Sequence, residues 1–246
     1  MRSKALKKVL KCNLLKTIRF NFRMLPFEKA VKLPFLFFGK VDFRSLKGRV
    51  EIEGPVSTGM VLIGEKDVYA DTAVQNTIWI INGTFIIHGP LKFFRGSYLL
   101  VARDAVLDIG SGGTIFGSHF KAFCFDHITI GENVRVAWDC QVYDTSFHYV
   151  EPIDQDNAVK PLTKPVVIGS RVWLGNRSTV AKGAVLPDDT IVASGSLVNK
   201  DFSQTAPYCM LAGSPAEVKA TGIRRIYDRK TERELDKKFN YPRTGL

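Results

Sequence analysis

The sequence has few cysteines and no long apolar run, and these absences exclude several classes of protein. Its 246 residues include four widely separated cysteines, Cys12, Cys124, Cys140 and Cys209. Because no two of them form a C-x-x-C pair, neither a disulfide framework nor a cysteine zinc site is predicted. No secretory apolar region precedes them, so we expect a reducing, cytoplasmic location. The longest apolar run near the N-terminus, 33–39, is interrupted by a proline and is far shorter than the ~20 residues of a membrane-spanning helix.

Acidic residues are scarce only at the N-terminal end. The chain holds 35 Lys and Arg against 24 Asp and Glu, a formal net charge of +11. Residues 1–49 contain 14 basic and 2 acidic residues, whereas residues 50–206 contain 12 basic and 17 acidic residues. A basic excess is typical of proteins that bind phosphate, nucleic acid or an anionic membrane surface. No nucleic-acid-binding motif accompanies this excess, so nucleic acid is not predicted as a partner.

A six-residue repeat dominates the C-terminal half. An aliphatic residue returns at every sixth position, at Ile168, Leu174, Val180, Leu186, Val192 and Val198. This period fits neither a helix nor a hairpin. It predicts short strands separated by corners, with three strands closing a triangular coil of ~18 residues and successive coils stacked ~4.8 Å apart. A sandwich or barrel would instead show turn signals about every 8–12 residues. The repeat therefore predicts a parallel β-solenoid.

The same phase continues upstream with interruptions. Ile130, Val136 and Val142 keep it, but the step from Leu107 to Cys124 is 17 residues instead of 18. We expect the glycines of 110–117 to absorb this slip. Residues 50–100 are typical of less regular β-coils, with turns at 82–83 and 89–90.

These patterns divide the chain into three parts. Residues 1–49 form a basic amphipathic and aromatic segment, residues 50–206 the β-solenoid with a loop excursion at 149–165, and residues 207–246 a C-terminal strand and helix. The C-terminal helix is expected over 223–239. The predicted fold class is thus mainly β, with helical segments at both ends.

Four motifs within the solenoid, in this order, resemble those of a known family. They are Tyr143-Asp-Thr-Ser-Phe-His148, Val172-Trp-Leu-Gly-Asn176, Val192-Ala-Ser-Gly-Ser-Leu-Val-Asn-Lys200 and Leu211-Ala-Gly-Ser-Pro215. The sequence is similar to the hexapeptide-repeat acyltransferases, in the branch with galactoside, maltose and xenobiotic O-acetyltransferases and bacterial surface-polysaccharide acetyltransferases. The resemblance implies a left-handed parallel β-helix, acetyl-CoA as donor, no metal ion, and a homotrimer whose donor groove lies between subunits.

His148 is the candidate general base. Acyl transfer to a hydroxyl needs a base that works near neutral pH, which histidine provides best among the common side chains. His148 ends the last regular hexad before the loop, and the family's base aligns with it. A base must be oriented by a partner, and we expect Asp144 in this role or in contact with the acceptor sugar, with Glu151 and Asp154 as alternatives. His119 is interpreted as a surface histidine or an acceptor-site residue.

The resemblance also assigns the residues that contact the donor. Carried over position by position, coenzyme A would contact Asn176, Ser194, Asn199 and Lys200, with Trp173 as a wall of the cleft. Glycines beside these positions allow backbone N–H groups to approach the pantetheine amides, and a lysine offers its charge to a phosphate.

The N-terminal segment allows two interpretations. Residues 4–18 are predicted to form one amphipathic helix with lysines around an apolar stripe, made by Leu6, Leu10, Leu14 and Ile18. Aromatic residues follow at 20–27 and 33–38. Such a segment suits peripheral association with an anionic membrane surface through residues 1–45, at the inner face of the membrane. It suits equally a cap over the open first coil.

The predicted function is acetyl-CoA-dependent transfer of an acetyl group to a saccharide hydroxyl in surface-polysaccharide or glycan biosynthesis. The acceptor itself, and whether it offers a hydroxyl or an amine, stays open at this point. One alternative is a metal enzyme of the gamma-type carbonic anhydrase kind, which would need three converging histidines. The spacing of His119, His127 and His148 does not match that expectation. The other alternative is a non-catalytic β-helix scaffold.

Overall fold

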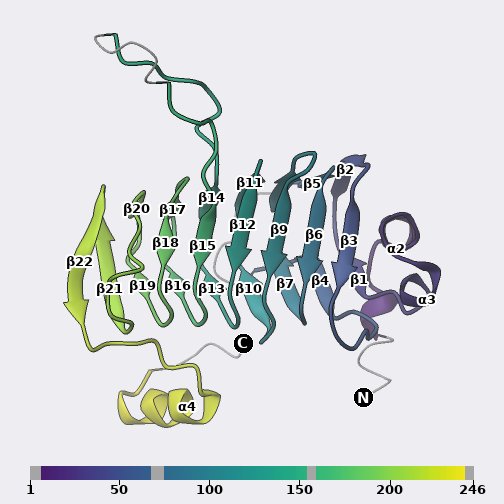
Figure 1. Ribbon diagram of the computed structural model, residues 1–246. Helices are drawn as coiled ribbons and strands as arrows, with labels where there is room; N and C mark the ends of the chain where they lie inside the picture. The colour runs from purple at the N-terminus through teal and green to yellow at the C-terminus, as the bar shows by residue number, and fades with distance from the viewer. Residues whose placement is uncertain (1–6, 68–74, 154–158, 242–246) are drawn as a thin grey trace.

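The chain winds through three parallel β-sheets in turn, as a computed structural model shows; the structure describes residues 7–67, 75–153 and 159–241. From β1 to β20, consecutive strands fall in different sheets and strands three places apart pair in parallel, so the sheets form the faces of one prism (Figure 1). Only β22 runs antiparallel to its partner among the named strands. The mainly β, parallel β-helix predicted from the repeat is confirmed.

The three sheets differ in strand number. The nine-stranded sheet contains β1 (Phe35–Phe37), β4 (Val61–Glu65), β7 (Leu91–Phe94), β10 (Thr114–Phe116), β13 (Arg135–Val136), β16 (Trp173–Leu174), β19 (Ile191–Val192), β21 (Cys209–Gly213) and β22 (Ala216–Thr221). The seven-stranded sheet contains β2 (Val41–Leu46), β5 (Thr77–Ile81), β8 (Tyr98–Val101), β11 (Lys121–Cys124), β14 (Gln141–Tyr143), β17 (Thr179–Val180) and β20 (Leu197–Val198). The six-stranded sheet contains β3 (Arg49–Ile52), β6 (Thr84–Ile87), β9 (Val106–Ile109), β12 (His127–Ile130), β15 (Val166–Ile168) and β18 (Val185–Leu186).

The coil length is uniform only near the C-terminal end. Leu174 pairs with Val192, 18 residues on, as the hexads predict. Upstream, Phe116 pairs with Val136, 20 residues on, and Phe93 pairs with Phe116, 23 residues on. The ~18-residue coil therefore holds where the hexads are regular, and the N-terminal coils are longer and less regular. Extra residues are accommodated at the corners, where the chain leaves the sheets and its length does not affect strand pairing.

The side chains that fill the core change along the axis of the β-helix, together with the length of the coils. Side chains alternate between inside and outside, as expected for strands. The N-terminal coils enclose large aromatic side chains, among them Trp79 and the stacked rings of Phe93 and Phe116, 4.3 Å apart. The C-terminal coils enclose aliphatic side chains such as Leu174 and Val192. The longer coils thus provide the interior volume that the aromatic rings fill.

The N-terminal segment does not form the single helix predicted over 4–18. A helical turn over 7–9 ends, and α2 (Leu14–Met24) begins after Asn13, whose side chain accepts a hydrogen bond from the Lys16 N–H at 3.2 Å. Residues 4–6 of the predicted helix lie outside the described residues. The short helix α3 (Phe27–Ala30) follows, and the β-helix begins at β1, before residue 50. Among the described helices, none is both long and apolar enough to cross a membrane.

The helix α2 closes the first coil with four buried residues, Thr17, Phe20, Asn21 and Met24. Asn21 donates to the Phe35 carbonyl at 2.8 Å and accepts from the Phe35 N–H at 3.1 Å, while the Thr17 hydroxyl accepts from the Phe37 N–H at 3.1 Å. These side chains take the place of a missing neighbouring strand at the exposed edge of β1. The capping function predicted as one of two alternatives is therefore present, on a different face from the leucine stripe.

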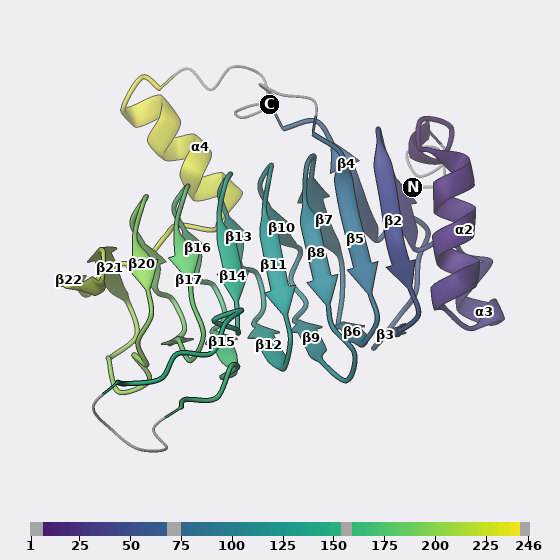
Figure 2. The same ribbon diagram turned by 90° about the horizontal axis from the view of Figure 1, so that it is seen from above.

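The C-terminal segment crosses the nine-stranded sheet before its helix. The helix α4 (Arg229–Lys238) starts after its N-cap residue Asp228, later than the expected 223, and lies beside β13 and β16 (Figure 2). Tyr227 holds the segment that leads into α4 against the β-helix, because its hydroxyl donates a hydrogen bond to the Arg171 carbonyl at 2.5 Å. The Arg225 guanidinium lies 4.8 Å from the Tyr227 ring centre.

Candidate active site

A long loop leaves the β-helix between β14 and β15 and projects away from the prism (Figure 1). Its two arms are paired at the base. Thr145 and Thr163 form an antiparallel bridge, and the Ser146 N–H donates to the Leu162 carbonyl at 2.9 Å. The Lys164 N–H donates to the Asp144 carbonyl at 2.9 Å. The loop base is therefore a fixed part of the fold.

A lysine from the next coil holds the same loop base. Lys182 follows β17, and its ammonium group donates to the Pro161 carbonyl at 2.8 Å and to the Ser146 hydroxyl at 3.1 Å. One side chain thereby joins the outgoing and returning arms. The sequence did not single out Lys182, because its partners lie about 20 and 36 positions earlier in the chain.

His148 lies at this fixed base, next to the start of the loop. Its N–H donates to the Ser146 carbonyl at 2.7 Å, and the preceding Phe147 adopts a left-handed backbone with φ of 62°. The Phe147 ring packs 5.6 Å from Phe123 and 6.0 Å from Tyr143. His148 itself is exposed. The backbone around the imidazole is thus positioned by its neighbours while the imidazole remains accessible.

A hollow of about 360 Å³ opens at the loop base and is lined by Ser146 and Val150, which stand two positions before and two positions after His148 in the chain. Its walls come from both arms of the loop and from the next coil, and they are formed by Ser146, Val150, Glu151, Pro152, Lys160 and Lys182. Glu151, one alternative partner of the base, therefore lies in this hollow, whereas Asp154 lies outside the described residues. A hollow of this size can hold a small acceptor.

Asp144 is buried at the corner where β14 ends. Its carboxylate accepts hydrogen bonds from the backbone N–H groups of Phe125 and Asp126, both at 2.8 Å. Burial raises the pKa of this carboxyl, and the two N–H groups offset part of the rise. No hydrogen bond joins it to His148, although both residues are described. In this geometry Asp144 holds the preceding corner and the loop base rather than the imidazole.

Asp144→Asn is expected to lower the free energy of unfolding by about 1–3 kcal/mol, because the amide leaves one buried N–H without an acceptor. The loss should be larger near pH 4 than near pH 7. Since the folded-state pKa is raised, the carboxyl stabilises the fold fully below its ordinary pKa and loses this contribution as pH rises. Urea denaturation at both pH values measures the difference. Glu28→Gln, at an exposed carboxylate on α3, is the control; an equal loss in both variants contradicts the prediction.

The residues assigned to the donor lie at two edges of the seven-stranded sheet. Asn176 and Ser194 stand where β17 and β20 begin, and the Ser194 hydroxyl donates to the Asn176 side-chain oxygen at 2.6 Å. Asn199 and Lys200 stand where β20 ends, at the same edge as His148 and Lys182, and both are exposed. With ~3.3 Å per strand residue, the two edges lie about 15 Å apart in one chain. The structure thus brings together Asn176 and Ser194, and separates both from Asn199 and Lys200.

Trp173 lies on the outer surface of the nine-stranded sheet. Its side chain points outward from β16, it is 38% exposed, and the Arg225 guanidinium lies 5.9 Å from its ring centre. Arg135 lies beside the same C-terminal segment, and burial together with the charge of Arg225 lowers its pKa. Trp173 therefore adjoins the Asn176 edge but not the Lys200 edge.

His119 is not the isolated surface histidine that was one of its two interpretations. Its Nδ1 lies 3.0 Å from a carboxylate oxygen of Asp139, one coil further on, and its side chain is only 12% exposed. The Nε2 atom is buried and has no hydrogen-bond partner among the described residues. A Cβ on Gly96 would lie 2.4 Å from the ring, so the imidazole stands directly over this glycine. The 20-residue spacing of His119 and Asp139 matches the local coil length, which is the signal that could have revealed the pair.

The cysteines inside the β-helix are not available as nucleophiles. Cys124, Cys140 and Cys209 are buried. Burial raises the pKa of Cys124, and it raises the pKa of Cys140 to about 11. Both thiols are therefore protonated near neutral pH, and the thiolate required for attack is not formed. In the part of the chain that the structure describes, no three His, Cys, Asp or Glu residues converge as metal ligands.

The fold and the motifs agree with comparisons to known proteins, although no family model matches the chain. Galactoside O-acetyltransferase of Escherichia coli K12 is 26% identical over 145 residues, 58% of this chain and 62% of that protein. A candidate lipopolysaccharide biosynthesis O-acetyl transferase of the same strain, WbbJ, is 28% identical over 122 residues, 44% of this chain and 61% of that protein. The matched region thus spans less than two thirds of either relative.

A solved structure extends the likeness to most of the fold. The polySia-specific acetyltransferase NeuO superimposes with a TM-score of 0.59 over 83% of each chain, at 21% identity. At this identity the likeness concerns the fold, which is the left-handed β-helix of these acetyltransferases. The relatives and the structural neighbour together confirm the resemblance to hexapeptide-repeat acetyltransferases that the motifs indicated.

Proposed function

We propose that the chain is an acetyl-CoA-dependent O-acetyltransferase that acts on a saccharide hydroxyl, with His148 as general base. The observation that carries this proposal is the position of His148. It is an accessible imidazole on a fixed loop base, and its sequence neighbours Ser146 and Val150 line a hollow of about 360 Å³, in a fold shared with acetyltransferases. The names of the relatives, a galactoside and a lipopolysaccharide O-acetyltransferase, support a sugar acceptor in surface-polysaccharide or glycan biosynthesis.

The proposed reaction is a direct transfer. His148 takes the proton of the acceptor hydroxyl while its oxygen attacks the thioester carbonyl of acetyl-CoA. Backbone N–H groups stabilise the oxyanion of the tetrahedral intermediate. The intermediate collapses with cleavage of the carbon–sulfur bond, and His148 returns the proton to the departing thiolate. Direct transfer is favoured over an acyl-cysteine because the thiols of Cys124 and Cys140 are buried and protonated.

We further propose that the donor groove lies between subunits of a homotrimer. Asn176, Ser194 and Trp173 adjoin one edge of the seven-stranded sheet, and Asn199 and Lys200 adjoin the other. In one chain these two groups of residues therefore lie at opposite edges of the sheet. In a closed ring of three chains, one edge of each subunit can face the opposite edge of its neighbour. Lys200 would then contribute its charge to a phosphate of coenzyme A, and Asp144 would position the loop that carries the base.

We propose a location in the cytoplasm, with peripheral association of residues 1–45 at the inner, anionic face of the membrane. The support is the charge distribution, since residues 1–49 contain 14 basic and 2 acidic residues. Basic residues near an anionic leaflet each contribute about 1 kcal/mol to binding. This location would bring the enzyme close to lipid-linked glycan precursors.

A thiol-release assay with acetyl-CoA tests the proposed function. Free, nucleotide-linked and lipid-linked sugars are offered as acceptors, and the product is analysed for an acetyl ester. We expect coenzyme A release that depends on at least one saccharide and on its hydroxyl groups. Release with an amine acceptor only would replace the ester assignment by N-acetylation. No release with any acceptor, from a folded protein that does not bind coenzyme A, would support a non-catalytic scaffold instead.

A further inference from the structure

The helix α2 presents three different faces, and only one of them is used to close the β-helix. Successive residues of an α-helix are rotated by about 100°, so side chains three and four positions apart share a face. Thr17, Phe20, Asn21 and Met24 form the face packed on the first coil. The helix itself lies at the end of the prism opposite to β22 and α4 (Figure 1).

The second face is apolar and exposed. Leu14, Leu15, Ile18 and Phe22 lie on it, and Leu15 is 83% exposed. The neighbouring Phe27 of α3 extends it, because its ring contacts that of Phe22 at 6.0 Å and is itself largely exposed. Leu14 and Ile18 belong to the stripe that the sequence pattern identified. The cap is therefore made by other residues, and the stripe remains without a partner in the described chain.

The third face is cationic and borders a hollow. Arg19 and Arg23 of α2 line a hollow of about 260 Å³ together with Arg44 and Lys47, over a floor of Phe43, Ser45 and Leu46. Arg44 is paired with Asp42 at 3.2 Å. No described carboxylate lies within salt-bridge distance of Arg19, Arg23 or Lys47. Three of the four cations are thus available to an anion.

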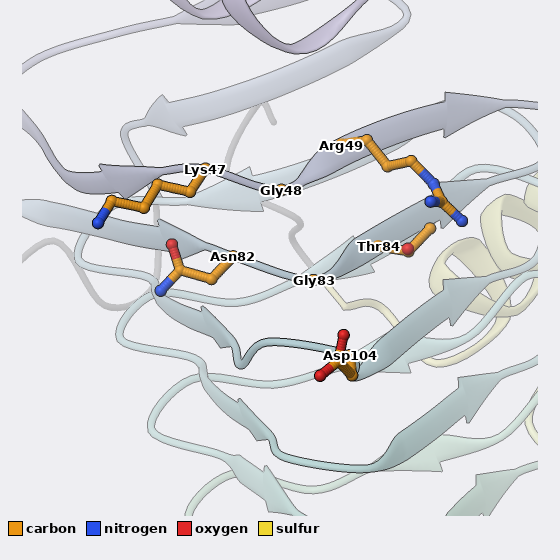
Figure 3. A pocket seen from close by; sticks show the side chains of 7 residues that line it. All are labelled: Lys47, Gly48, Arg49, Asn82, Gly83, Thr84 and Asp104. Carbon is orange, nitrogen blue, oxygen red and sulfur yellow. The ribbon is translucent and has the colours of Figure 1, made fainter.

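A second hollow nearby does not have the same lining of cations without a carboxylate. It has about 290 Å³ and shares Lys47 with the first, but it is formed by stacked turns that include Gly48, Gly83 and Asp104 (Figure 3). The carboxylate of Asp104 reduces the positive charge there. The hollow against α2 is lined by cations without a carboxylate, and it lies next to the exposed apolar face.

We propose that this outer surface of α2 docks on an anionic lipid bilayer, with Arg19, Arg23 and Lys47 binding lipid headgroup phosphates and the apolar face inserted beside them. Amphipathic helices with large apolar side chains next to Lys and Arg bind membranes in this way. A nucleic acid would use the cations but would leave Leu15 and Phe27 exposed to water. The inference deepens the peripheral association proposed above, and it is independent of acetyl transfer.

Vesicle cosedimentation of the full-length protein tests this surface. We expect binding to phosphatidylcholine vesicles that contain phosphatidylglycerol, weak binding to pure phosphatidylcholine, and weaker binding as salt screens the charges. Arg19→Glu/Arg23→Glu should lower the partition coefficient at least about tenfold, and Leu15→Glu should also lower it. The matched controls are Lys237→Glu/Lys238→Glu and Phe239→Glu on α4, with the same changes at exposed positions. Inorganic phosphate at constant ionic strength should not release the protein.

Several results would overturn the proposal. Wild-type protein that does not bind anionic vesicles refutes both the surface and the association, whereas binding that the α2 variants retain refutes the surface alone. Release by inorganic phosphate assigns the hollow to a free anion. An oligomer dissolved by Leu15→Glu, without vesicle binding, assigns the apolar face to a second copy. Turnover of a soluble acceptor, measured on the same variants, should be unchanged, which separates these results from a failure of the proposed acetyl transfer.

Discussion

His148→Asn is expected to reduce the rate of acetyl transfer by about 100- to 10,000-fold, the range that a positioned general base contributes. The hydroxyl of a sugar is a poor nucleophile until its proton is removed, and asparagine cannot accept that proton. Folding should be unaffected because the His148 side chain is exposed and makes no described side-chain hydrogen bond. Initial rates of thiol release, with the best acceptor from the sugar panel, measure the effect. Thermal melting of the same preparation confirms that the fold is intact.

His127→Asn is the matched control for this loss. His127 begins β12 in the six-stranded sheet and does not line the hollow at the loop base, and its replacement should leave the rate close to that of the wild type. Should His148→Asn retain full activity, the assignment of the base is wrong. The paired imidazole of His119 would then be the next candidate, because its Nδ1 is held by Asp139 and its Nε2 has no partner among the described residues. His119→Asn tests this alternative at a position with a left-handed backbone, which asparagine tolerates.

The regular half of the fold was predictable because a single period controls it. From Ile168 on, each hexad places one aliphatic residue inside the prism, and pairs such as Leu174 and Val192 keep the same register. In the N-terminal half this six-residue period is not regular. Its coils are longer, its corners vary, and its interior holds rings such as Trp79 and Phe93. A repeat can be recognised in a sequence only when the residues that point into the core are evenly spaced. Corners of variable length make this spacing uneven.

Sequence reasoning found the part of the candidate site that lies within one continuous sequence motif. His148 was identified because it ends a recognisable motif before the loop. The Lys182 contacts and the pairing of His119 with Asp139 were missed, because such partners are neighbours across coils and not along the chain. The pairing of Asp144 with the base was expected from proximity in sequence. The structure instead uses its carboxylate to bind the backbone of Phe125 and Asp126, an interaction that depends on the preceding coil.

The N-terminal helix shows why an apolar stripe alone does not determine which face is buried. The leucines at four-residue intervals suggested one helix whose apolar stripe would either bind a membrane surface or cap the first coil. Asn13 interrupts that helix, and the buried face of α2 contains two polar residues, Thr17 and Asn21. Their burial is favourable because they satisfy the backbone groups of Phe35 and Phe37 at the edge of β1. A hydrophobicity pattern does not predict the burial of a polar side chain that forms the hydrogen bonds of a missing neighbouring strand.

Phe20→Ala is expected to lower the free energy of unfolding by about 3–5 kcal/mol, the usual loss for a buried phenylalanine. Phe20 is fully buried, and its ring lies 4.9 Å from those of Phe35 and Phe37 and 5.5 Å from Trp79. The variant leaves a cavity between α2 and the first coil, so the amides of β1 should also exchange faster with solvent. Phe22→Ala on the same helix is the control, because this ring is 47% exposed and its loss should cost under about 0.5 kcal/mol. Urea denaturation measures both values. Equal losses in the two variants would mean that α2 does not close the β-helix through its Phe20 face, and the division of the helix into a capping face and an outward face would be wrong.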